Sequence, residues 1–486
     1  MFESYEIECY GRKYVGNVSL REFHKFTRKG DICLFIVETM AVHGISELAS
    51  RIIDRVSSSF GGLVPGEMVK ELRKFDLVVE ENSDTGEKAP AVGDDDAGAD
   101  GQEGYLGVSG IALLVAQECN MSCVYCYGQD GEYAGKGMMS EETAFRAVDW
   151  LIENSKGIDR VNISFFGGEP LLNFPLIRKT VEYAKVKVSE KNKKVTFSLT
   201  TNGSLLTDEI ISFLREEKIV PMVSFDGPPA LQNRQRPFKN GSGSYDAVRE
   251  NIRKLQAVLP DVVARGTVCD DADPAECREG IERLGVKRYY VFKASPVVLA
   301  GEEERDTHCS ADESISNRMI SFQEKEWDEF FASVKNRKIE INDASERFFP
   351  LIMGKKRYFS CGVGKGLVGI SAAGDIYPCH RFVGLEDVKF GNIDDYKAEG
   401  INDYHRGVVN NVPQCSVCWT RYLCGGGCLY DNRAHTGDMH RPDVLFCKET
   451  KSAMETAIHI CAQLEVDDRE YVKKMAAEQM ANGSLP

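Results

Sequence analysis

The sequence predicts an α/β protein whose central domain is a partial barrel of six strand–helix units, (β/α)6. A length of 486 residues is too great for one ordinary domain. Between residues 105 and 300, short apolar runs rich in β-branched and aromatic residues alternate with segments of helical spacing. Three of the 16 cysteines fall within residues 119–126 and seven within residues 361–447. These observations together predict a parallel sheet followed by a cysteine-rich domain.

A smaller α+β domain is predicted over residues 1–81. Residues 23–46 contain strand-like runs interrupted by a turn, and residues 47–56 and 66–75 follow with helical spacing. This order resembles the PqqD-like, winged-helix-like domain that recognises peptides in many peptide-modifying enzymes; an α+β appendage without that role is the alternative. Residues 82–104 are acidic and rich in Gly and Ala, with almost no large apolar side chains, which predicts a flexible linker.

The central domain is predicted over residues 105–300. Its predicted strands are 110–117, 161–167, 195–203, 220–227, 262–268 and 288–296, and its predicted helices are 141–155, 174–186, 208–217 and 246–256. Ligands of such sheets bind at the carboxyl ends of the strands, so we expect the site there. Residues 301–357 are predicted to form a helical bridge, residues 358–450 the cysteine-rich domain and residues 451–486 a terminal helix.

Charge and composition limit the partners. A net charge of −15 argues against nucleic acid or an anionic membrane, because both favour a basic face. No apolar run approaches the ~20 residues that span a bilayer, and the N-terminus lacks a secretory pattern, so a cytoplasmic protein is expected. In a reducing compartment, clustered cysteines favour metal over disulfides. The cysteines outside the clusters are expected to be ordinary small apolar residues: Cys9, Cys33, Cys269, Cys277, Cys309 and Cys461.

The first cluster follows the first predicted strand, as Cys119, Cys123 and Cys126. A [4Fe–4S] cluster usually needs four thiolates, so three in one loop leave one iron open. A zinc knuckle or a ferredoxin half-site is the alternative, although structural zinc normally takes four protein ligands. The CxxxCxxC spacing, the aromatic Tyr125 and the position after strand one resemble the radical S-adenosylmethionine (radical SAM) family. The resemblance implies that S-adenosylmethionine binds the open iron through its amino and carboxylate groups.

Two further segments match the cofactor contacts of that family. After the second strand come Gly167 and Gly168, which permit close approach of the backbone to a ligand, and Glu169, which can accept from the ammonium group. Ser224 and Arg236 follow the fourth strand, where the resemblance implies contacts with the ribose and the carboxylate. An arginine suits a buried carboxylate. The alternative for Arg236 is a surface salt bridge.

The second cluster matches the seven-cysteine SPASM domain in its spacing, with a zinc ribbon as the alternative. The resemblance implies two auxiliary [4Fe–4S] clusters, and therefore three clusters in all. Their implied ligands are Cys415, Cys418, Cys424 and Cys447 for the distal cluster, and Cys361, Cys379 and Cys428 for the nearer one. Where some members have an eighth cysteine, this chain has Leu367. The nearer cluster is then open to a substrate thiolate, water or another ligand.

His380 directly follows Cys379, in the run Cys-His-Arg-Phe-Val-Gly. Sulfatase-maturing relatives typically have an aspartate at this place. The run more closely resembles maturases that form thioethers in ribosomal peptides, of the sactipeptide and ranthipeptide type. His380 is either a base, since a histidine pKa lies near neutrality, or a hydrogen-bond donor to the cluster.

The resemblance as a whole implies a radical SAM/SPASM peptide maturase. A 5′-deoxyadenosyl radical would remove a hydrogen from the peptide, and a cysteine sulfur would attack the carbon to give a thioether. The N-terminal domain would hold the leader of a ribosomal precursor peptide by strand addition, and a flavodoxin- or ferredoxin-like protein would supply electrons. The alternatives are a maturase that crosslinks Cys to Asp or Glu, as in quinohemoprotein amine dehydrogenase, an anaerobic sulfatase (formylglycine) maturase, and a non-catalytic iron–sulfur or zinc protein that binds peptides.

Overall fold

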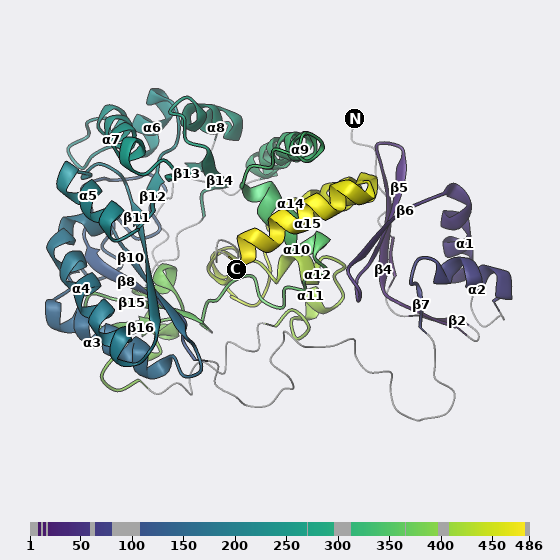
Figure 1. Ribbon diagram of the computed structural model, residues 1–486, viewed down its shortest axis with the longest axis horizontal. Coiled ribbons are helices and arrows are strands. Elements are labelled where there is room, and N and C mark those ends of the chain that lie inside the picture. Colours follow the sequence, from purple (N-terminus) through teal and green to yellow (C-terminus); the bar gives the residue numbers. More distant parts are fainter. Residues whose placement is uncertain are drawn as a thin grey trace.

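One long sheet forms the left-hand part of the molecule in Figure 1. The computed structural model describes residues 8–10, 13–15, 18–58, 64–79, 107–269, 271–295, 313–364, 366–396 and 408–481. The predicted linker and the first part of the predicted bridge lie outside these residues. Side chains are described from Leu20 onward.

In the part of the chain that the structure describes, ten strands form this sheet, in the order β14-β13-β12-β11-β10-β8-β15-β16-β17, with β9 beside β8. Six strands pair in parallel and correspond to the six predicted ones: β8 (Gly110–Gln117), β10 (Arg160–Gly167), β11 (Lys194–Thr201), β12 (Pro221–Ser224), β13 (Val263–Val268) and β14 (Arg288–Lys293). Their carboxyl ends lie at one edge. The closure of the sheet into a partial barrel stays a prediction.

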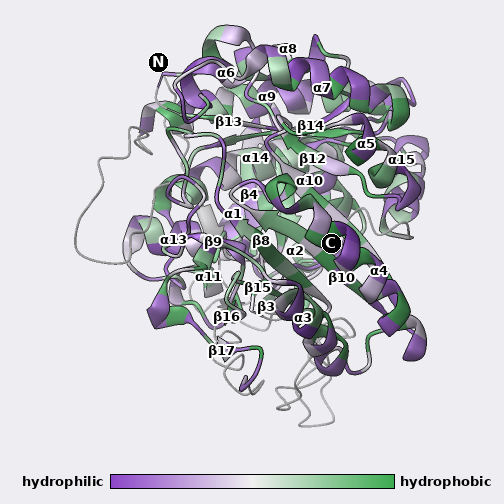
Figure 2. Ribbon diagram, turned by 90° about the vertical axis from the view of Figure 1, so that its left-hand side faces the viewer, coloured by the Kyte–Doolittle hydropathy of each residue, from purple (hydrophilic) through white to green (hydrophobic). Residues whose placement is uncertain are grey.

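Helices that connect these strands cover the outer side of the sheet (Figure 1). They are α3 (Glu141–Asn154), α4 (Phe174–Glu190), α5 (Asp208–Glu216), α6 (Pro229–Gln235), α7 (Tyr245–Val258) and α8 (Pro274–Glu282). The four predicted helices are confirmed, whereas α6 and α8 were not predicted. Strands β8 and β10 are largely hydrophobic and helices such as α4 and α7 show both colours, as buried strands under amphipathic helices should (Figure 2).

The predicted cysteine-rich domain does not stand apart from the central sheet. Strand β15 (Leu367–Ile370) pairs in parallel with β8, and the antiparallel strands β16 (Asp375–Tyr377) and β17 (Gly391–Asn392) extend the sheet further. Val368 and Ile370 are fully buried in the same core as β8. The sequence prediction missed this pairing because a four-residue apolar run does not reveal a distant partner strand.

Long helices dominate the C-terminal part. They are α9 (Glu313–Lys335) and α10 (Asp343–Ile352) within the predicted bridge, then α14 (Val444–Gln463) and α15 (Val466–Ala481). The single predicted terminal helix is therefore wrong: two helices occupy this region, and the first begins inside the predicted cysteine-rich domain. Short elements lie between them: η2 (His380–Phe382), η3 (Glu386–Val388), α11 (Pro413–Ser416), α12 (Arg421–Cys424) and α13 (Leu429–Thr436). Among the described helices, none is long and apolar enough to cross a bilayer.

The N-terminal domain has strands before helices, as predicted. One sheet has the order β1-β4-β5-β6 and a second has the order β2-β3-β7. The elements are β1 (Glu8–Tyr10), β2 (Lys13–Val15), β3 (Val18–Leu20), β4 (Phe23–Arg28), β5 (Asp31–Ile36), β6 (Ala41–Ile45), α1 (Glu47–Ser58), α2 (Gly66–Arg73) and β7 (Val78–Val79). The likeness to a PqqD-like, winged-helix-like domain stays a prediction.

Strand β5 is buried on both faces, because successive side chains of a strand point in opposite directions. Leu34 and Ile36 pack with α1 and α2 in the core of the N-terminal domain. Cys33 and Phe35 face the other way, into a core that includes Ile458 of α14. The N-terminal domain therefore shares a core with the C-terminal helices, and Figure 1 shows its sheet against the ends of those helices.

Two polar contacts fix this interface near the distal cysteines. The Glu22 carboxylate pairs with both terminal nitrogens of Arg421, one of them at 2.6 Å, and the Arg421 side chain is only 7% exposed. The His24 ring stacks on Trp419 with the ring centres 3.9 Å apart. Trp419 and Arg421 lie in the turn into α12, inside the predicted motif of the distal cluster.

The interface pair predicts a measurable loss of stability. Glu22→Ala leaves the Arg421 guanidinium buried without its carboxylate, and breaking such a pair typically costs about 3–5 kcal/mol. Glu47→Ala is the control, because Glu47 and Arg51 form an exposed pair on α1 with side chains 80% and 79% exposed, and such pairs contribute about 0–1 kcal/mol. Urea denaturation followed by circular dichroism measures both variants. Equal, small losses in the two would contradict the structural role of the buried pair.

Strand β10 approaches β8 most closely at its end. The register shifts between Phe166 and Gly167, and Gly167 has φ +136°. A Cβ atom on Gly167 would lie 2.1 Å from the carbonyl oxygen of Ala116, and one on Gly168 would lie 2.3 Å from that of Glu118. The packing of two backbone segments therefore requires these glycines. Their predicted approach to a ligand stays a prediction.

We expect Gly167→Ala to destabilise the protein by about 2–5 kcal/mol, from overpacking of about 1–3 kcal/mol and positive-φ strain of about 1–2 kcal/mol. Gly157→Ala separates the two terms: Gly157 has φ +74°, but nothing lies within 4 Å of an added Cβ. Gly157→Ala should therefore lose only the stability that the positive-φ strain costs, about 1–2 kcal/mol. Thermal unfolding of the two variants tests this, and a Gly167 variant no less stable than the Gly157 variant would refute the close contact.

Candidate cofactor and substrate site

The Cys119–Cys126 loop leaves the carboxyl end of β8 and runs beside the segment that follows α6. The Ser122 amide donates to the carbonyl of Pro237 (2.9 Å), and the Val124 amide donates to the carbonyl of Gln235 (3.0 Å). This segment carries the predicted carboxylate-binding arginine. The structure therefore brings two predicted parts of the site together, although more than a hundred residues separate them in the sequence.

The three predicted cluster thiols lie together in this loop. Burial raises the pKa of Cys123 to about 12; the Arg236 guanidinium lowers it, and the charges of Cys126 and Cys119 raise it. Among the described residues, no three His, Cys, Asp or Glu side chains are arranged to share a single metal ion. An iron–sulfur cube holds its cysteine sulfurs farther apart than a single ion does, so three thiols in one loop fit the donor set of a cluster.

Arg236 is buried beside the loop, not in a surface salt bridge. It is 7% exposed, and its Nη1 donates to the Tyr125 hydroxyl at 2.6 Å. That hydroxyl in turn donates to Asp226 Oδ2 at 2.6 Å. The Nε of Arg236 is buried and has no hydrogen-bond partner among the described residues. A free, buried guanidinium N–H fits the predicted role of binding the carboxylate of S-adenosylmethionine.

Asp226 is a candidate site residue that the sequence prediction did not include. It is fully buried, and it also accepts from Gln235 Nε2 (2.9 Å) and from the Thr267 amide (3.0 Å). Burial raises the pKa of its carboxyl, while the Arg236 charge and the Tyr125 hydrogen bond oppose that rise. Its position directly after β12, at the carboxyl edge of the sheet, was the available signal.

Glu169 has protein partners for both carboxylate oxygens. Oε1 accepts from the Leu171 amide (3.0 Å) and the Thr201 hydroxyl (2.8 Å), and Oε2 accepts from the Asn202 amide (2.7 Å). The side chain is fully buried, and burial raises its pKa. Glu169 thus links the ends of β10 and β11. Its predicted contact with the ammonium group of the cofactor stays a prediction.

Two neutral side chains lie at the same edge. Ser224 ends β12, and its hydroxyl makes no hydrogen bond with the described residues. Its predicted contact with the ribose stays a prediction. Asn202 donates to Asn120 Oδ1 (2.8 Å), and its Nδ2 lies 3.7 Å from Cys119 Sγ. Asn202 therefore orients the start of the cysteine loop, which was not predicted.

The three cysteines predicted for the nearer auxiliary cluster also lie together. Burial raises the pKa of Cys379 to about 12, and the charges of Cys428 and Cys361 raise it further. Thiols that act on one another in this way are close neighbours. Leu367, in the place of an eighth cysteine, begins β15 and is half-buried.

The predicted distal ligands form a second group. Burial raises the pKa of Cys415 to about 12, and the charges of Cys424, Cys418 and Cys447 raise it further. Every cysteine whose side chain is described is a free thiol. Four of those expected to be ordinary apolar residues are indeed buried: Cys33, Cys269, Cys277 and Cys461. Cys309 and the side chain of Cys9 lie outside the description.

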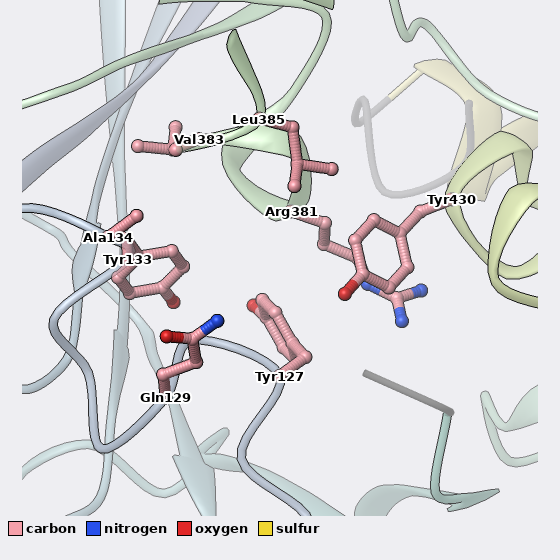
Figure 3. Close-up of a pocket in the computed structure, with 9 residues that line it drawn as sticks. Tyr127, Gln129, Tyr133, Ala134, Arg381, Val383, Leu385 and Tyr430 are labelled. Atoms are coloured by element: carbon pink, nitrogen blue, oxygen red, sulfur yellow. The ribbon is translucent and has the colours of Figure 1, made fainter. Parts of the chain in front are cut away.

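A small cavity, partly open to solvent, lies between the first loop and the nearer group (Figure 3). Tyr127, which follows the third cysteine of the loop, lines it together with Arg381 and Tyr430. The Arg381 guanidinium lies 4.1 Å from the ring centre of Tyr430 and 5.0 Å from that of Tyr127. It also donates to Cys428 Sγ (3.3 Å) and pairs with Asp431 (2.8 Å). Arg381 thus connects the two cysteine sites.

His380 lies between the same two sites. Its ring centre is 4.2 Å from that of Phe166, at the end of β10, and 6.4 Å from that of Tyr127. Burial lowers the pKa of His380 to about 3, and the charges of Arg381 and Arg265 lower it further. The ring is therefore neutral at physiological pH. Neither predicted role, base or hydrogen-bond donor to the cluster, has been tested.

Residues 113–284 match the family model of the Radical SAM superfamily. This range extends from within β8 to just beyond α8 and includes the Cys119–Cys126 loop, Tyr125, Asp226 and Arg236. The match therefore covers the part of the chain that forms the cofactor side of the site.

Two characterised relatives align with different shares of the chain. The radical SAM cyclopropyl synthase TigE of Paramaledivibacter caminithermalis is 30% identical over 165 residues, which cover 31% of this chain and 32% of TigE. The serine-type anaerobic sulfatase-maturating enzyme of Bacteroides thetaiotaomicron is 25% identical over 403 residues, which cover 76% of this chain and 94% of that enzyme. The chain thus matches about a third of the length of TigE and nearly all of the sulfatase-maturating enzyme.

Two solved structures resemble the fold. The structure of anSMEcpe with bound AdoMet and Cp18Cys peptide has a TM-score of 0.60 and 21% identity, over 73% of this chain and 98% of that chain. SuiB of Streptococcus suis bound to its precursor peptide SuiA has a TM-score of 0.50 and 13% identity, over 85% of this chain and 96% of that chain. With the three-cysteine loop at the carboxyl edge of a parallel sheet, the family match shows that this chain carries a radical SAM domain, over residues 113–284.

Proposed function

We propose that the chain is a peptide maturase that joins a cysteine sulfur to a carbon atom of a ribosomally synthesised precursor peptide, in a thioether. The cavity between the two cysteine sites carries this proposal. Tyr127 extends into it from the first loop, and Arg381 and Tyr430 extend into it from the nearer auxiliary group. A peptide segment that lies across the mouth of this cavity would contact residues next to both sites at once.

The residues on the cofactor side have separate roles. When bound, S-adenosylmethionine with a reduced cluster supplies a radical that removes hydrogen from an unactivated carbon. Cys119, Cys123 and Cys126 would hold that cluster. Arg236 would hold the carboxylate of S-adenosylmethionine, and its link through Tyr125 to Asp226 keeps the guanidinium in place.

The auxiliary side would prepare the sulfur. Cys361, Cys379 and Cys428 would hold the nearer cluster, and with Leu367 in the eighth position one iron would be free for a substrate thiolate. The N–H of Arg381 on Cys428 Sγ stabilises negative charge on that sulfur. The distal thiols around Cys415 would hold a third cluster, fully ligated by protein. A flavodoxin- or ferredoxin-like protein would deliver the electron that reduces the first cluster. When the C–S bond replaces a C–H and an S–H bond, the hydrogen atom would leave with 5′-deoxyadenosine, the proton would go to solvent and the remaining electron would pass to the auxiliary clusters.

The comparisons support a peptide substrate. The Bacteroides thetaiotaomicron relative matures sulfatases, anSMEcpe is described with a bound peptide, and SuiB is described with its precursor peptide. Because the solved structures are under 25% identical to the chain, they support the arrangement of the fold and not the reaction.

The N-terminal domain would hold the leader of the precursor. In the described chain, β1 and β6 are the two ends of its four-stranded sheet, and an extended peptide pairs readily with such an edge. The core shared with α14 would keep a bound leader at a fixed distance from the cavity.

A second candidate function is sulfatase maturation. The match over 94% of the Bacteroides thetaiotaomicron enzyme favours it. His380 disfavours it, because sulfatase-maturing relatives typically carry an aspartate at this place to accept the substrate proton. The neutral ring of His380 offers no equivalent carboxylate.

Removing the cluster ligands tests the initiation step. The combined variant Cys119→Ala, Cys123→Ala and Cys126→Ala should form no 5′-deoxyadenosine, because no thiolate of the loop remains. Cys461→Ala is the matched control, since Cys461 is buried in the core of the C-terminal helices. Chromatography after anaerobic reconstitution and reduction measures the product. Wild-type levels from the combined variant would exclude this loop as the initiation site.

Tyr125→Phe should weaken the binding of S-adenosylmethionine by about 10-fold or more, because Arg236 loses a hydrogen-bond partner that joins it to Asp226, and such bonds to charged groups contribute about 1.5–3 kcal/mol. Tyr183→Phe is the control, as the Tyr183 hydroxyl donates to Asp149 (2.8 Å) on the outer helices. Equilibrium dialysis gives both dissociation constants. If Tyr125→Phe binds S-adenosylmethionine as tightly as the wild type, the network does not contribute to the cofactor site.

Mass spectrometry tests the product. A cysteine-containing peptide encoded beside this gene should lose two hydrogens per linkage after anaerobic incubation, and alkylation should show that the cysteine is blocked. Cys361→Ala should still form 5′-deoxyadenosine while losing most of the crosslink. A formylglycine residue in place of a linkage would favour sulfatase maturation instead.

A further inference from the structure

Arg265 projects from the inner side of the sheet. Its neighbour Ala264 packs into the core under the outer helices, as does Val268, so Arg265 points the opposite way. Its partners in the sheet are Ser224 on β12 and Tyr290 on β14. Paired residues of parallel strands project on the same side, which places Arg265 beside the predicted cofactor contact Ser224.

Within the described chain no carboxylate lies at ion-pair distance from the Arg265 guanidinium, although the charge of Asp431 acts on it. The only described side-chain contact of this guanidinium is the ring of Phe292, 5.0 Å from the guanidinium carbon to the ring centre. Two neighbouring arginines are paired with carboxylates: Arg288 with Glu346 (3.1 Å), and Arg381 with Asp431 (2.8 Å).

Arg265 is exposed to solvent, although protein surrounds its guanidinium. Solvent reaches the side chain of Arg265, yet burial lowers the pKa of its guanidinium. A residue with both properties lies in a recess and not on a convex surface. The charge of Arg265 acts on Tyr127, which follows the first cysteine loop, and on His380, which follows Cys379. Tyr127 lines the cavity of Figure 3, so the charge of Arg265 reaches the wall of that cavity.

We propose that Arg265 binds a carboxylate of the peptide substrate, the side chain of an aspartate or glutamate at or next to the modified residue. This inference rests on the proposed function and adds the class of substrate. A planar guanidinium binds a carboxylate through two parallel N–H bonds, and Phe292 would hold its plane.

The carboxylate of S-adenosylmethionine is the other anion in the site. Arg236 already offers it a buried, free N–H beside the cysteine loop. Arg265 is therefore left to bind the substrate. Substitution of Arg265 should weaken the binding of the peptide carboxylate and not that of S-adenosylmethionine, and this difference distinguishes the two anions.

The test uses the full-length, cluster-loaded protein and two capped tripeptides, acetyl-Cys-Asp-Ala-amide and acetyl-Cys-Asn-Ala-amide. Binding is followed by ligand-observed NMR in the presence of S-adenosylmethionine. We expect the Asp peptide to bind the wild type about 10-fold more tightly, as a charge-assisted hydrogen bond predicts. This preference should vanish in Arg265→Gln and persist in part in Arg265→Lys. Arg283→Gln is the control, because Arg283 is an exposed arginine on the outer side, 72% exposed.

Each outcome of this binding test either supports or overturns the role of Arg265. Equal binding of the two peptides to the wild type, or an Asp preference that survives in Arg265→Gln, overturns the inference. If Arg265→Gln no longer binds S-adenosylmethionine but still prefers the Asp peptide, Arg265 binds the cofactor. This result also overturns the inference. If Asp preference depends on Arg265 but no precursor is ever crosslinked, the carboxylate site stands and the thioether function fails.

Discussion

The parallel pairing of β15 with β8 determines the arrangement of the site. Through this pairing the C-terminal cysteine-bearing segment joins the same sheet that carries the first cysteine loop. A Cβ on Gly369 would lie 2.5 Å from the carbonyl carbon of Cys379, so the backbone at Cys379 is pressed against β15. His380 then meets Phe166 of β10, and Arg381 reaches Tyr127. Without β15 in the sheet, the two cysteine sites would have no fixed separation.

A buried charge network supports the cofactor side. Burying a guanidinium costs free energy unless hydrogen bonds and opposite charge compensate it. For Arg236 the compensation passes through the Tyr125 hydroxyl to Asp226, which Gln235 and the Thr267 amide hold in turn. The network leaves one N–H of Arg236 free. A site that is held rigidly and lacks one partner is prepared for an anionic ligand.

Burial on both faces of one strand joins the N-terminal domain to the rest of the chain. A sheet that is apolar on both faces needs cover on both, and β5 obtains it from its own helices and from α14. Glu22 and Arg421 place that interface beside the distal cysteines. Under the proposed function, a leader bound to the N-terminal sheet therefore has a defined path to the cavity.

The amino-acid sequence alone determined the central strands, most of their helices and the grouping of the cysteines. These follow from local periodicity and from spacings along the chain, as in the alternation of residues 161–217 and the loop Cys119–Cys126. The same local rules predicted that Arg236 and Ser224 belong near the loop, by resemblance. They did not reveal Asp226 as the centre of the network.

Only the tertiary structure decided which distant segments meet. The pairing of Leu367–Ile370 with β8, the contact of Arg381 with Tyr127, and the isolation of Arg265 all depend on residues far apart in the chain. It also gave Glu169 partners in β11 that its neighbours in the sequence do not suggest. Periodicity records which side of an element is buried, but it carries no information about the partner that buries it, and for that reason the site as a whole emerges only in the folded chain.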